Sequence, residues 1–207
     1  MYEERVKLTT SCRDTDYIPK VKNAGEIHEE NGEKYQLMHN GVKVTYGGYH
    51  GEWMGEIIER LRGHHEPQEE KVFYEILKHV PKGGAMIELG SFWAYYSAWF
   101  NHDIECAKNY MIEPNVEKIE VGKKNFLLNG MQGTFVNAFI GGRSSENETF
   151  TDWDGKKTSL PMVSIDEFIK THDISEVDIL HSDIQGAELE MLNGCENSIR
   201  DKKINFF

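Results

Sequence analysis

Long apolar runs and cysteine motifs are both missing from this chain of 207 residues. No stretch approaches the ~20 apolar residues that span a bilayer, and the N-terminus MYEERVKLTTSCRD has no apolar core of a secretion signal. The three cysteines, Cys12, Cys106 and Cys195, are far apart and form neither a CxxC pair nor a zinc-binding spacing with histidine. We therefore expect a soluble protein of a reducing, cytoplasmic compartment, with no membrane partner.

Positive charge is also scarce. Lysine and arginine number 23 against 35 aspartates and glutamates, which gives a net charge of -12. A protein that binds the phosphate backbone of a nucleic acid needs a basic surface. We therefore expect no nucleic-acid partner, and the pattern carries no signal for the oligomeric state.

The chain has no internal repeat or low-complexity tract, and its pattern divides it into two parts. Residues 1–62 are expected to form a cap, which consists of a polar, irregular arm over 1–34, a hairpin that turns at Asn40-Gly41, and a helix. Residues 63–207 are expected to form the main domain.

Strands and helices alternate through this main domain. After a helix that starts at Pro67 and is stopped by Pro81, the expected elements are a strand over 85–89, a helix over 92–100, a strand over 109–112, a helix over 115–128, a strand over 134–138, a loop over 141–158, a helix over 164–169, a strand over 177–181, a helix over 187–192 and a strand from 204. Alternating units of this length indicate an α/β fold, with a mostly parallel sheet flanked by helices.

The first strand of the main domain ends in a turn with one glycine, in the stretch IELGSFWA. Ligands of such sheets bind at the carboxyl ends of the strands, but a dinucleotide loop needs the pattern GxGxxG, which is absent here. Glu88, at the strand end, would repel a pyrophosphate and attract an ammonium or sulfonium group. S-adenosylmethionine carries both cations, so we expect Glu88, Gly90, Ser91 and Phe92 to contact this cofactor. The other aromatic residues of the following helix are expected to be core.

A second acid follows the next strand. Glu113 lies in YMIEPN, 23 residues after Gly90, where an acidic side chain binds ribose hydroxyls in nucleotide-binding sheets. The expected cofactor contacts of this part of the chain are Glu113, Pro114, Asn115, Asn137 and Ala138.

The segments SIDEF, residues 164–168, and DIQGAE, residues 183–188, resemble the FkbM family of S-adenosylmethionine-dependent methyltransferases. That family shows a "sLDel" helix followed by a strand and "DvqGaE". With IELGSFWA and IEPN, the resemblance extends over roughly residues 66–194. It implies a class I methyltransferase fold, Rossmann-like, and O-methylation, typically of sugar or polyketide hydroxyls.

Three departures from the family pattern stand out. Ala94 occupies the place of a second glycine, which should tighten the turn without abolishing the site. His181 replaces the usual lysine two residues before Asp183. The chain ends at KINFF, where this fold normally continues to an antiparallel strand pair, so we expect those strands to be missing or supplied by the hairpin over 35–46.

The candidate catalytic residues are His181, Asp183 and Glu188. His181 and Asp183 are two residues apart at a strand end, so they share a face if the strand continues that far. Either could take the proton of an acceptor hydroxyl, and Asp183 could instead orient the histidine. Asp183 is also expected to contact the cofactor, whereas Glu188 could make a buried structural contact.

No metal site is assigned. Asp183 and Glu188 could hold a divalent cation, but two acids do not make a metal site. The adjacent histidines of GHHEPQEE are expected to face solvent on a loop.

The expected activity is O-methylation of a sugar, a glycan or a related small molecule. Two alternatives stay open: a catalytically silent module of the same fold that binds partners, and a nicotinamide-dependent oxidoreductase, which the missing GxGxxG disfavours. The segment CRDTDYIPK, residues 12–20, is expected to fold over the cleft and help bind the acceptor.

Overall fold

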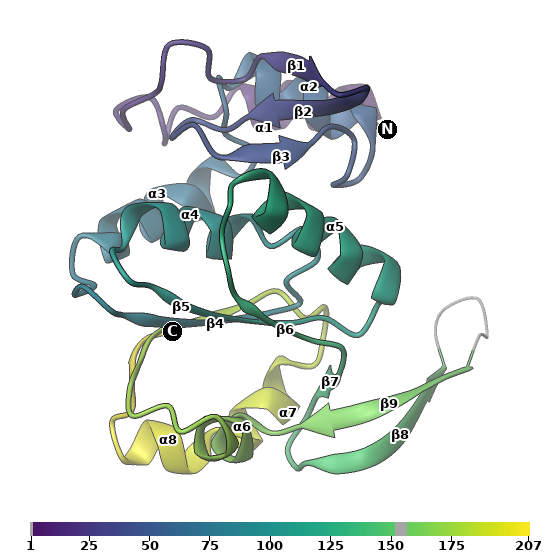
Figure 1. The fold of residues 1–207 in the computed structure, drawn as a ribbon, viewed down its shortest axis with the longest axis vertical. Helices are drawn as coiled ribbons and strands as arrows, with labels where there is room; N and C mark the ends of the chain where they lie inside the picture. The colour runs from purple at the N-terminus through teal and green to yellow at the C-terminus, as the bar shows by residue number, and fades with distance from the viewer. Residues whose placement is uncertain (1, 152–156) are drawn as a thin grey trace.

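The central element of the protein is a five-stranded, entirely parallel sheet with the order β11-β10-β4-β5-β6 (Figure 1). The structure is a computed structural model, and it describes residues 2–151 and 157–207. The strands are β4 (Ala85–Leu89), β5 (Lys108–Ile112), β6 (Thr134–Val136), β10 (Val177–Ser182) and β11 (Ile204–Phe206). The expected α/β fold with a parallel sheet is confirmed.

Helices cover both faces of this sheet. One face carries α3 (Pro67–Leu77), α4 (Tyr95–Asp103) and α5 (Val116–Leu128); the other carries α6 (Ile165–Thr171), α7 (Glu188–Asn193) and α8 (Glu196–Arg200) (Figure 1). Strand β4 shows why both faces need cover. Met86 packs into the hydrophobic cluster on the α3–α5 side, and Ile87 and Leu89 pack into the cluster on the other side. A strand buried on both faces is typical of parallel sheets.

The first sixty residues are more ordered than expected. The elements are α1 (Tyr2–Thr10), β1 (Ile27–Glu30), β2 (Glu33–Leu37), β3 (Lys43–Thr45) and α2 (Glu52–Arg60). The hairpin β2–β3 is confirmed, but the irregular arm was a wrong prediction, because β1 pairs with β2 in antiparallel fashion around Asn31-Gly32. Both turn residues have the positive φ that an Asn-Gly hairpin turn requires.

The sheet β1-β2-β3 stays separate from the five-stranded sheet, so the hairpin does not supply further strands to it. Its edge instead packs on α5, where Asn125 and Asn129 accept hydrogen bonds from the backbone N–H groups of Thr45 and Lys43, each at 2.8 Å. Buried side chains of the cap and of α3 and α4 form one continuous hydrophobic cluster.

Residues 141–158 were expected to be a loop, and this was wrong for the part that the structure describes. Strands β7 (Phe139–Ile140), β8 (Ser145–Thr151) and β9 (Lys157–Val163) form a third sheet with the order β7-β9-β8 (Figure 1). The segment is polar because most of its side chains face solvent, and this hid its strand character. Positions 152–156 lie outside the described residues. Within the described ranges, no helix has the length and apolar character needed to cross a membrane.

Candidate active site

The turn after β4 brings three strand ends together. Gly90 has φ 71°, and its N–H donates to the carbonyl of Ile112, at the end of β5, at 2.9 Å. A Cβ on Gly90 would lie 2.1 Å from the carbonyl oxygen of Asp183, just beyond β10. Only glycine fits here, because the φ value is left-handed and the space is already filled.

The turn continues further than expected, so α4 begins at Tyr95 and not at Phe92. Phe92 and Ala94 have φ values of 41° and 54°, which a right-handed helix cannot contain. Ala94 takes this left-handed conformation without being glycine. Its methyl group has room because α5 carries Gly122 opposite, where a Cβ would lie only 3.1 Å from the Cβ of Ala94.

Glu113 holds this turn in place from the end of β5. Its carboxylate accepts the N–H of Phe92 at 3.2 Å and the N–H of Asn115 at 2.8 Å. Asn137 donates to the carbonyl oxygens of Glu113 and Pro114, each at 2.9 Å, and thereby ties the end of β6 to the same place. Burial raises the pKa of Glu113 despite these hydrogen bonds.

Glu88 was expected to contact the cofactor, and the structure shows its carboxylate in the protein interior. Its side chain is only 3% exposed and points into the interior under α4, where it accepts the N–H of Ser97 at 3.1 Å. Burial raises the pKa of Glu88 to about 7. Glu88 therefore anchors the start of α4, and a direct contact with a cofactor cation stays a prediction.

The remaining expected cofactor residues surround the turn in different ways. Ser91 is buried, and its hydroxyl has no hydrogen-bond partner among the described residues. Asn115 begins α5 and accepts the N–H groups of Glu117 and Lys118, while Ala138 is fully buried after β6. Phe92 is half-buried, and the aromatic side chains of α4 are core, as expected.

Asp183 is exposed at the end of β10, beside Gly90. One of its carboxylate oxygens accepts a hydrogen bond from the amide of Gln185 at 2.6 Å. Glu188 does not make the buried contact considered for it. It is exposed at the start of α7 and accepts the N–H of Gly186 at 3.1 Å.

His181 has a different partner from the expected one. Strand β10 ends at Ser182, between His181 and Asp183. The Nε2 atom of His181 lies 2.7 Å from the carboxylate of Glu69 in α3. Burial alone would lower the pKa of His181, but the hydrogen bond to Glu69 and nearby carboxylates raise it. The carboxylate that contacts the His181 ring is therefore that of Glu69.

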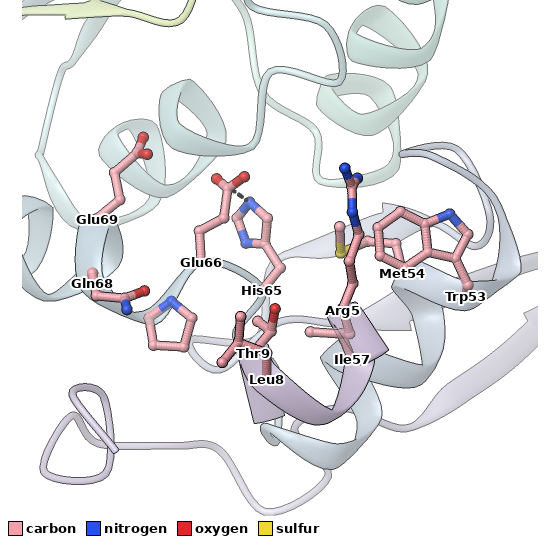
Figure 2. A pocket seen from close by; sticks show the side chains of 11 residues that line it. Arg5, Leu8, Thr9, Trp53, Met54, Ile57, His65, Glu66, Gln68 and Glu69 are labelled. Atoms are coloured by element: carbon pink, nitrogen blue, oxygen red, sulfur yellow. Dashed lines mark ion pairs between the residues drawn. The ribbon is translucent and has the colours of Figure 1, made fainter. Parts of the chain in front are cut away.

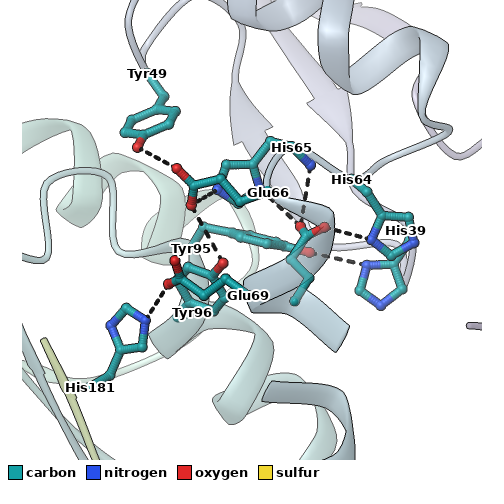
Figure 3. A network of polar contacts seen from close by, with 10 residues as sticks. His39, Tyr49, His64, His65, Glu66, Glu69, Tyr95, Tyr96 and His181 are labelled. Carbon is teal, nitrogen blue, oxygen red and sulfur yellow. Dashed lines mark hydrogen bonds and ion pairs between the residues drawn. The ribbon is translucent and has the colours of Figure 1, made fainter. Parts of the chain in front are cut away.

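The adjacent histidines are not on a solvated loop, and that expectation was wrong. His64 and His65 are at most 1% exposed, and each Nδ1 atom lies 2.9 Å from an oxygen of the fully buried Glu70 (Figure 3). Burial disfavours the charged forms of His65 and Glu70, but the attraction between the histidine and its neighbouring carboxylates outweighs this effect. The neighbouring carboxylates of Glu66 and Glu70 raise the pKa of His65 to about 10, and the two histidines lower that of Glu70 to about 2.

Glu66 extends this network toward the turn. It forms an ion pair with His65, accepts the hydroxyl of Tyr49 at 3.3 Å, and lies 3.5 Å from the hydroxyl of Tyr96 (Figure 3). Burial would raise the pKa of Glu66, but His65 lowers it overall. Tyr49 also packs against the ring of Phe92, at 5.1 Å between centroids. A chain of contacts thus joins the buried histidines to the turn after β4.

The segment over residues 12–20 does not fold over the strand ends. Asp14 forms an ion pair with Lys71 at 2.8 Å, and the hydroxyl of Tyr17 donates to Glu75 at 2.8 Å, so the segment lies along α3. Helix α1 approaches the site instead, as one wall of a cavity beside Glu66 and Glu69.

Glu66, Glu69 and Glu70 were missed as site residues although the sequence contains a signal for them. Residues 66, 69 and 70 are spaced i, i+3 and i+4, so they lie on the same side of a helix at its start, and they directly follow two histidines. Among the described residues, no group of three or more histidine, cysteine, aspartate or glutamate side chains is arranged to hold a metal ion.

The parallel sheet, the single-glycine turn and the acids at the strand ends define a Rossmann-like, class I methyltransferase fold. The family model "Methyltransferase FkbM domain" matches residues 75–207. The chain belongs to this family.

Comparison with individual proteins adds little. No curated protein matches the chain. The solved structure of a protein-L-isoaspartate O-methyltransferase is similar to it at 14% identity with a TM-score of 0.31, over 66% of this chain and 41% of that chain. The chain thus spans about two fifths of the length of that protein.

Proposed function

We propose that the protein is an S-adenosylmethionine-dependent O-methyltransferase that acts on a hydroxyl of a sugar, a glycan or a related small molecule. Membership of a methyltransferase family supports the reaction class. The observation that carries the proposal is the turn after β4, where Gly90 lies against the backbone of Asp183 and Glu113 holds Phe92. The turn expected to bind the cofactor is therefore in contact with the segment that carries Asp183, the candidate base.

The residues of the turn fit the cofactor. The buried hydroxyl of Ser91 has no hydrogen-bond partner among the described residues, so it is available to a ligand, and the left-handed φ of Gly90 sets the turn that carries Ser91. Glu113, at the end of β5, is placed to accept hydrogen bonds from ribose hydroxyls through lone pairs that Phe92 and Asn115 leave free. When bound, the cofactor supplies an electrophilic methyl group.

The acceptor's hydroxyl has to lose its proton as the methyl group is transferred. Asp183 is exposed beside the turn, so its carboxylate can take that proton. His181 is less suited to this step, because Glu69 occupies its Nε2 atom and its raised pKa favours the protonated form. We therefore assign Asp183 as the base and His181 with Glu69 as a pair that shapes the acceptor side.

The experiment is titration calorimetry with S-adenosylhomocysteine and, separately, with NAD. We expect binding of the first only, and Glu113→Ala to weaken it by about 1–3 kcal/mol, the scale of a lost hydrogen bond to a charged group. Glu120→Ala, an exposed change on α5, is the matched control. An unchanged dissociation constant in folded Glu113→Ala removes Glu113 from the site, and preference for NAD favours the oxidoreductase.

Catalysis is tested by mass spectrometry of glycans and small sugars incubated with enzyme and S-adenosylmethionine. A mass increase of one methyl group in an acceptor supports the proposed reaction. Binding of S-adenosylhomocysteine without a methylated product across the panel favours the catalytically silent module.

A further inference from the structure

We infer that the cavity between α1, α2 and the start of α3 is the acceptor subsite, and that it takes a neutral, hydroxyl-bearing ring of monosaccharide size. The inference rests on the proposed function. The cavity has a volume of about 380 Å³ and is drawn in Figure 2. This is near the small end of the ~300–1,000 Å³ range of ligand pockets, so it suits one small molecule and excludes a folded partner.

The cavity is connected to the candidate active site through two of its own residues. Glu69 lines it and also lies 2.7 Å from His181, at the end of β10. Glu66 lines it too and accepts the hydroxyl of Tyr49, which packs on Phe92 in the turn. A molecule in this cavity therefore lies next to the strand ends, beside the place expected for the cofactor.

The two walls of the cavity differ in chemistry (Figure 2). The start of α3 contributes polar groups from Glu66, Gln68 and Glu69. Apolar side chains of the lining come mainly from α2, with Trp53, Met54 and Ile57, and from Leu8 in α1. A sugar ring matches this division, because it has hydroxyls around its edge and C–H groups on its faces.

The charges of the cavity favour a neutral ligand. Glu66 is already paired with His65, and Glu69 is already hydrogen-bonded to His181. An ammonium group on the ligand would compete with these histidines for the same carboxylates. An anionic ligand would meet the carboxylates of Glu66 and Glu69 on the polar wall, because the positive charge of His65 is already paired with Glu66 and Glu70, and Arg5 lies across the cavity. Hydroxyl groups can use the remaining lone pairs of Glu66 and Glu69 without disturbing either pair.

The test is saturation-transfer NMR of the full chain with millimolar methyl glucoside, methyl galactoside, methyl glucuronide and methyl glucosaminide as probes. We expect contact with at least one neutral glycoside. Thr9→Trp fills the cavity from α1, so the saturation-transfer signal of the neutral glycoside should fall at least 10-fold in this variant. Lys7→Trp, on the same helix but outside the cavity, should give the wild-type signal. Circular dichroism checks that both variants fold. If Thr9→Trp does not fold, a second cavity-filling variant, Leu8→Trp, replaces it.

Three outcomes overturn the inference: no neutral glycoside binds, only the charged glycosides bind, or a folded cavity-filling variant binds as wild type does. Titration with S-adenosylhomocysteine on the same samples keeps the two proposals apart. We expect Thr9→Trp to retain wild-type affinity for it within about 2-fold. If wild type binds the glycoside in the cavity but not S-adenosylhomocysteine, the proposed function fails and the ligand site stands.

Discussion

The two halves of the candidate active site are built by different kinds of contact. On the cofactor side, Gly90, Phe92 and Glu113 are held mainly by backbone hydrogen bonds between strand ends. On the acceptor side, Glu69 and His65 are held by side-chain pairs between α3 and its surroundings. The backbone contacts depend on the sheet, whereas the pair of His65 with Glu70 depends on complete burial of both side chains.

This difference predicts how each half fails. The cofactor side should be sensitive to added volume, because its backbone segments already touch. The acceptor side should be sensitive to lost charge, because the buried His64, His65 and Glu70 are stable in the interior only as partners. Substitutions on the two sides can therefore be compared directly.

The largest effect is expected from Glu70→Gln. The variant leaves the buried His64 without a carboxylate and leaves His65 with Glu66 as its acidic partner, and breaking such a buried pair costs about 3–5 kcal/mol in the free energy of unfolding. Urea denaturation measures this. Glu120→Gln, which removes an exposed ion pair with Lys123, is the control and should change stability by less than about 1 kcal/mol. Equal losses in the two variants would contradict the proposed role of burial.

The same pair predicts a pH dependence of stability. Glu70 has a native pKa of about 2, below its usual value of 4.5, so its contribution is present above about 4.5 and is lost as the pH falls through 2. His65 has a native pKa of about 10, above its usual 6.5, so its contribution is full below about 6.5 and is lost as the pH rises through 10. The difference in the free energy of unfolding between wild type and Glu70→Gln should be largest between about pH 4.5 and pH 6.5, where both contributions are full.

Gly90→Ala should have the next largest effect, on the cofactor side. The left-handed φ costs a non-glycine residue roughly 1–2 kcal/mol, and the overlap with the carbonyl of Asp183 adds roughly 1–3 kcal/mol. We also expect S-adenosylhomocysteine binding to weaken at least 10-fold in calorimetry. Gly130→Ala is matched in φ, at 64°, but has open space around it, so only the backbone strain should remain. Identical losses of stability would show that the close packing of Gly90 has no importance.

Asp183→Asn should lower turnover at least ~10²-fold while folding and cofactor affinity survive, because the amide keeps the size of the side chain but cannot take a proton. Turnover of a methylated acceptor is measured by mass spectrometry, with Asp201→Asn, an exposed change after α8, as the control. If His181 is the base, His181→Ala costs as much and the two losses are not additive. Wild-type rates in both single variants would refute this half of the site.

The smallest effect is expected from Glu69→Gln, as a shift in the titration of His181. Burial lowers the pKa of His181, and the hydrogen bond to Glu69 is the first of the contacts that raise it, so its loss should lower this pKa even though Glu88 and Asp183 remain nearby. NMR titration of the imidazole detects this change, and Glu117→Gln, exposed on α5, is the control. An unchanged titration curve of His181 in Glu69→Gln would show that Glu69 does not raise the pKa of this histidine.

The sequence predicted the features that depend on local pattern. The alternation of strands and helices, the single-glycine turn and the acid after β5 are all visible in short stretches. The turn Asn31-Gly32 carried an equally local signal for β1, which the polar composition of the arm concealed. Phe92 and Ala94 look helical in sequence, and only the packing of the turn against Gly122 shows that they are not.

The features that the sequence did not predict depend on distant contacts. His64 and His65 resemble solvated loop residues until the cap covers them, and Glu69 can be matched to His181 only when α3 lies across β10, 112 residues further along the chain. The strands of residues 141–158 alternate weakly because they bury little. Burial by a remote segment has no short-range signature.

The contact between Gly90 and Asp183 makes the two halves thermodynamically linked. The backbone that approaches the cofactor and the residue assigned to take the acceptor's proton touch without any intervening side chain. We expect a ligand that stiffens the turn also to restrict the loop that carries Asp183, and any gain in acceptor affinity from the proposed cofactor to be matched by the same factor in the reverse direction. Positive cooperativity between the proposed cofactor and acceptor is therefore the expected consequence of a glycine that has no room for a side chain.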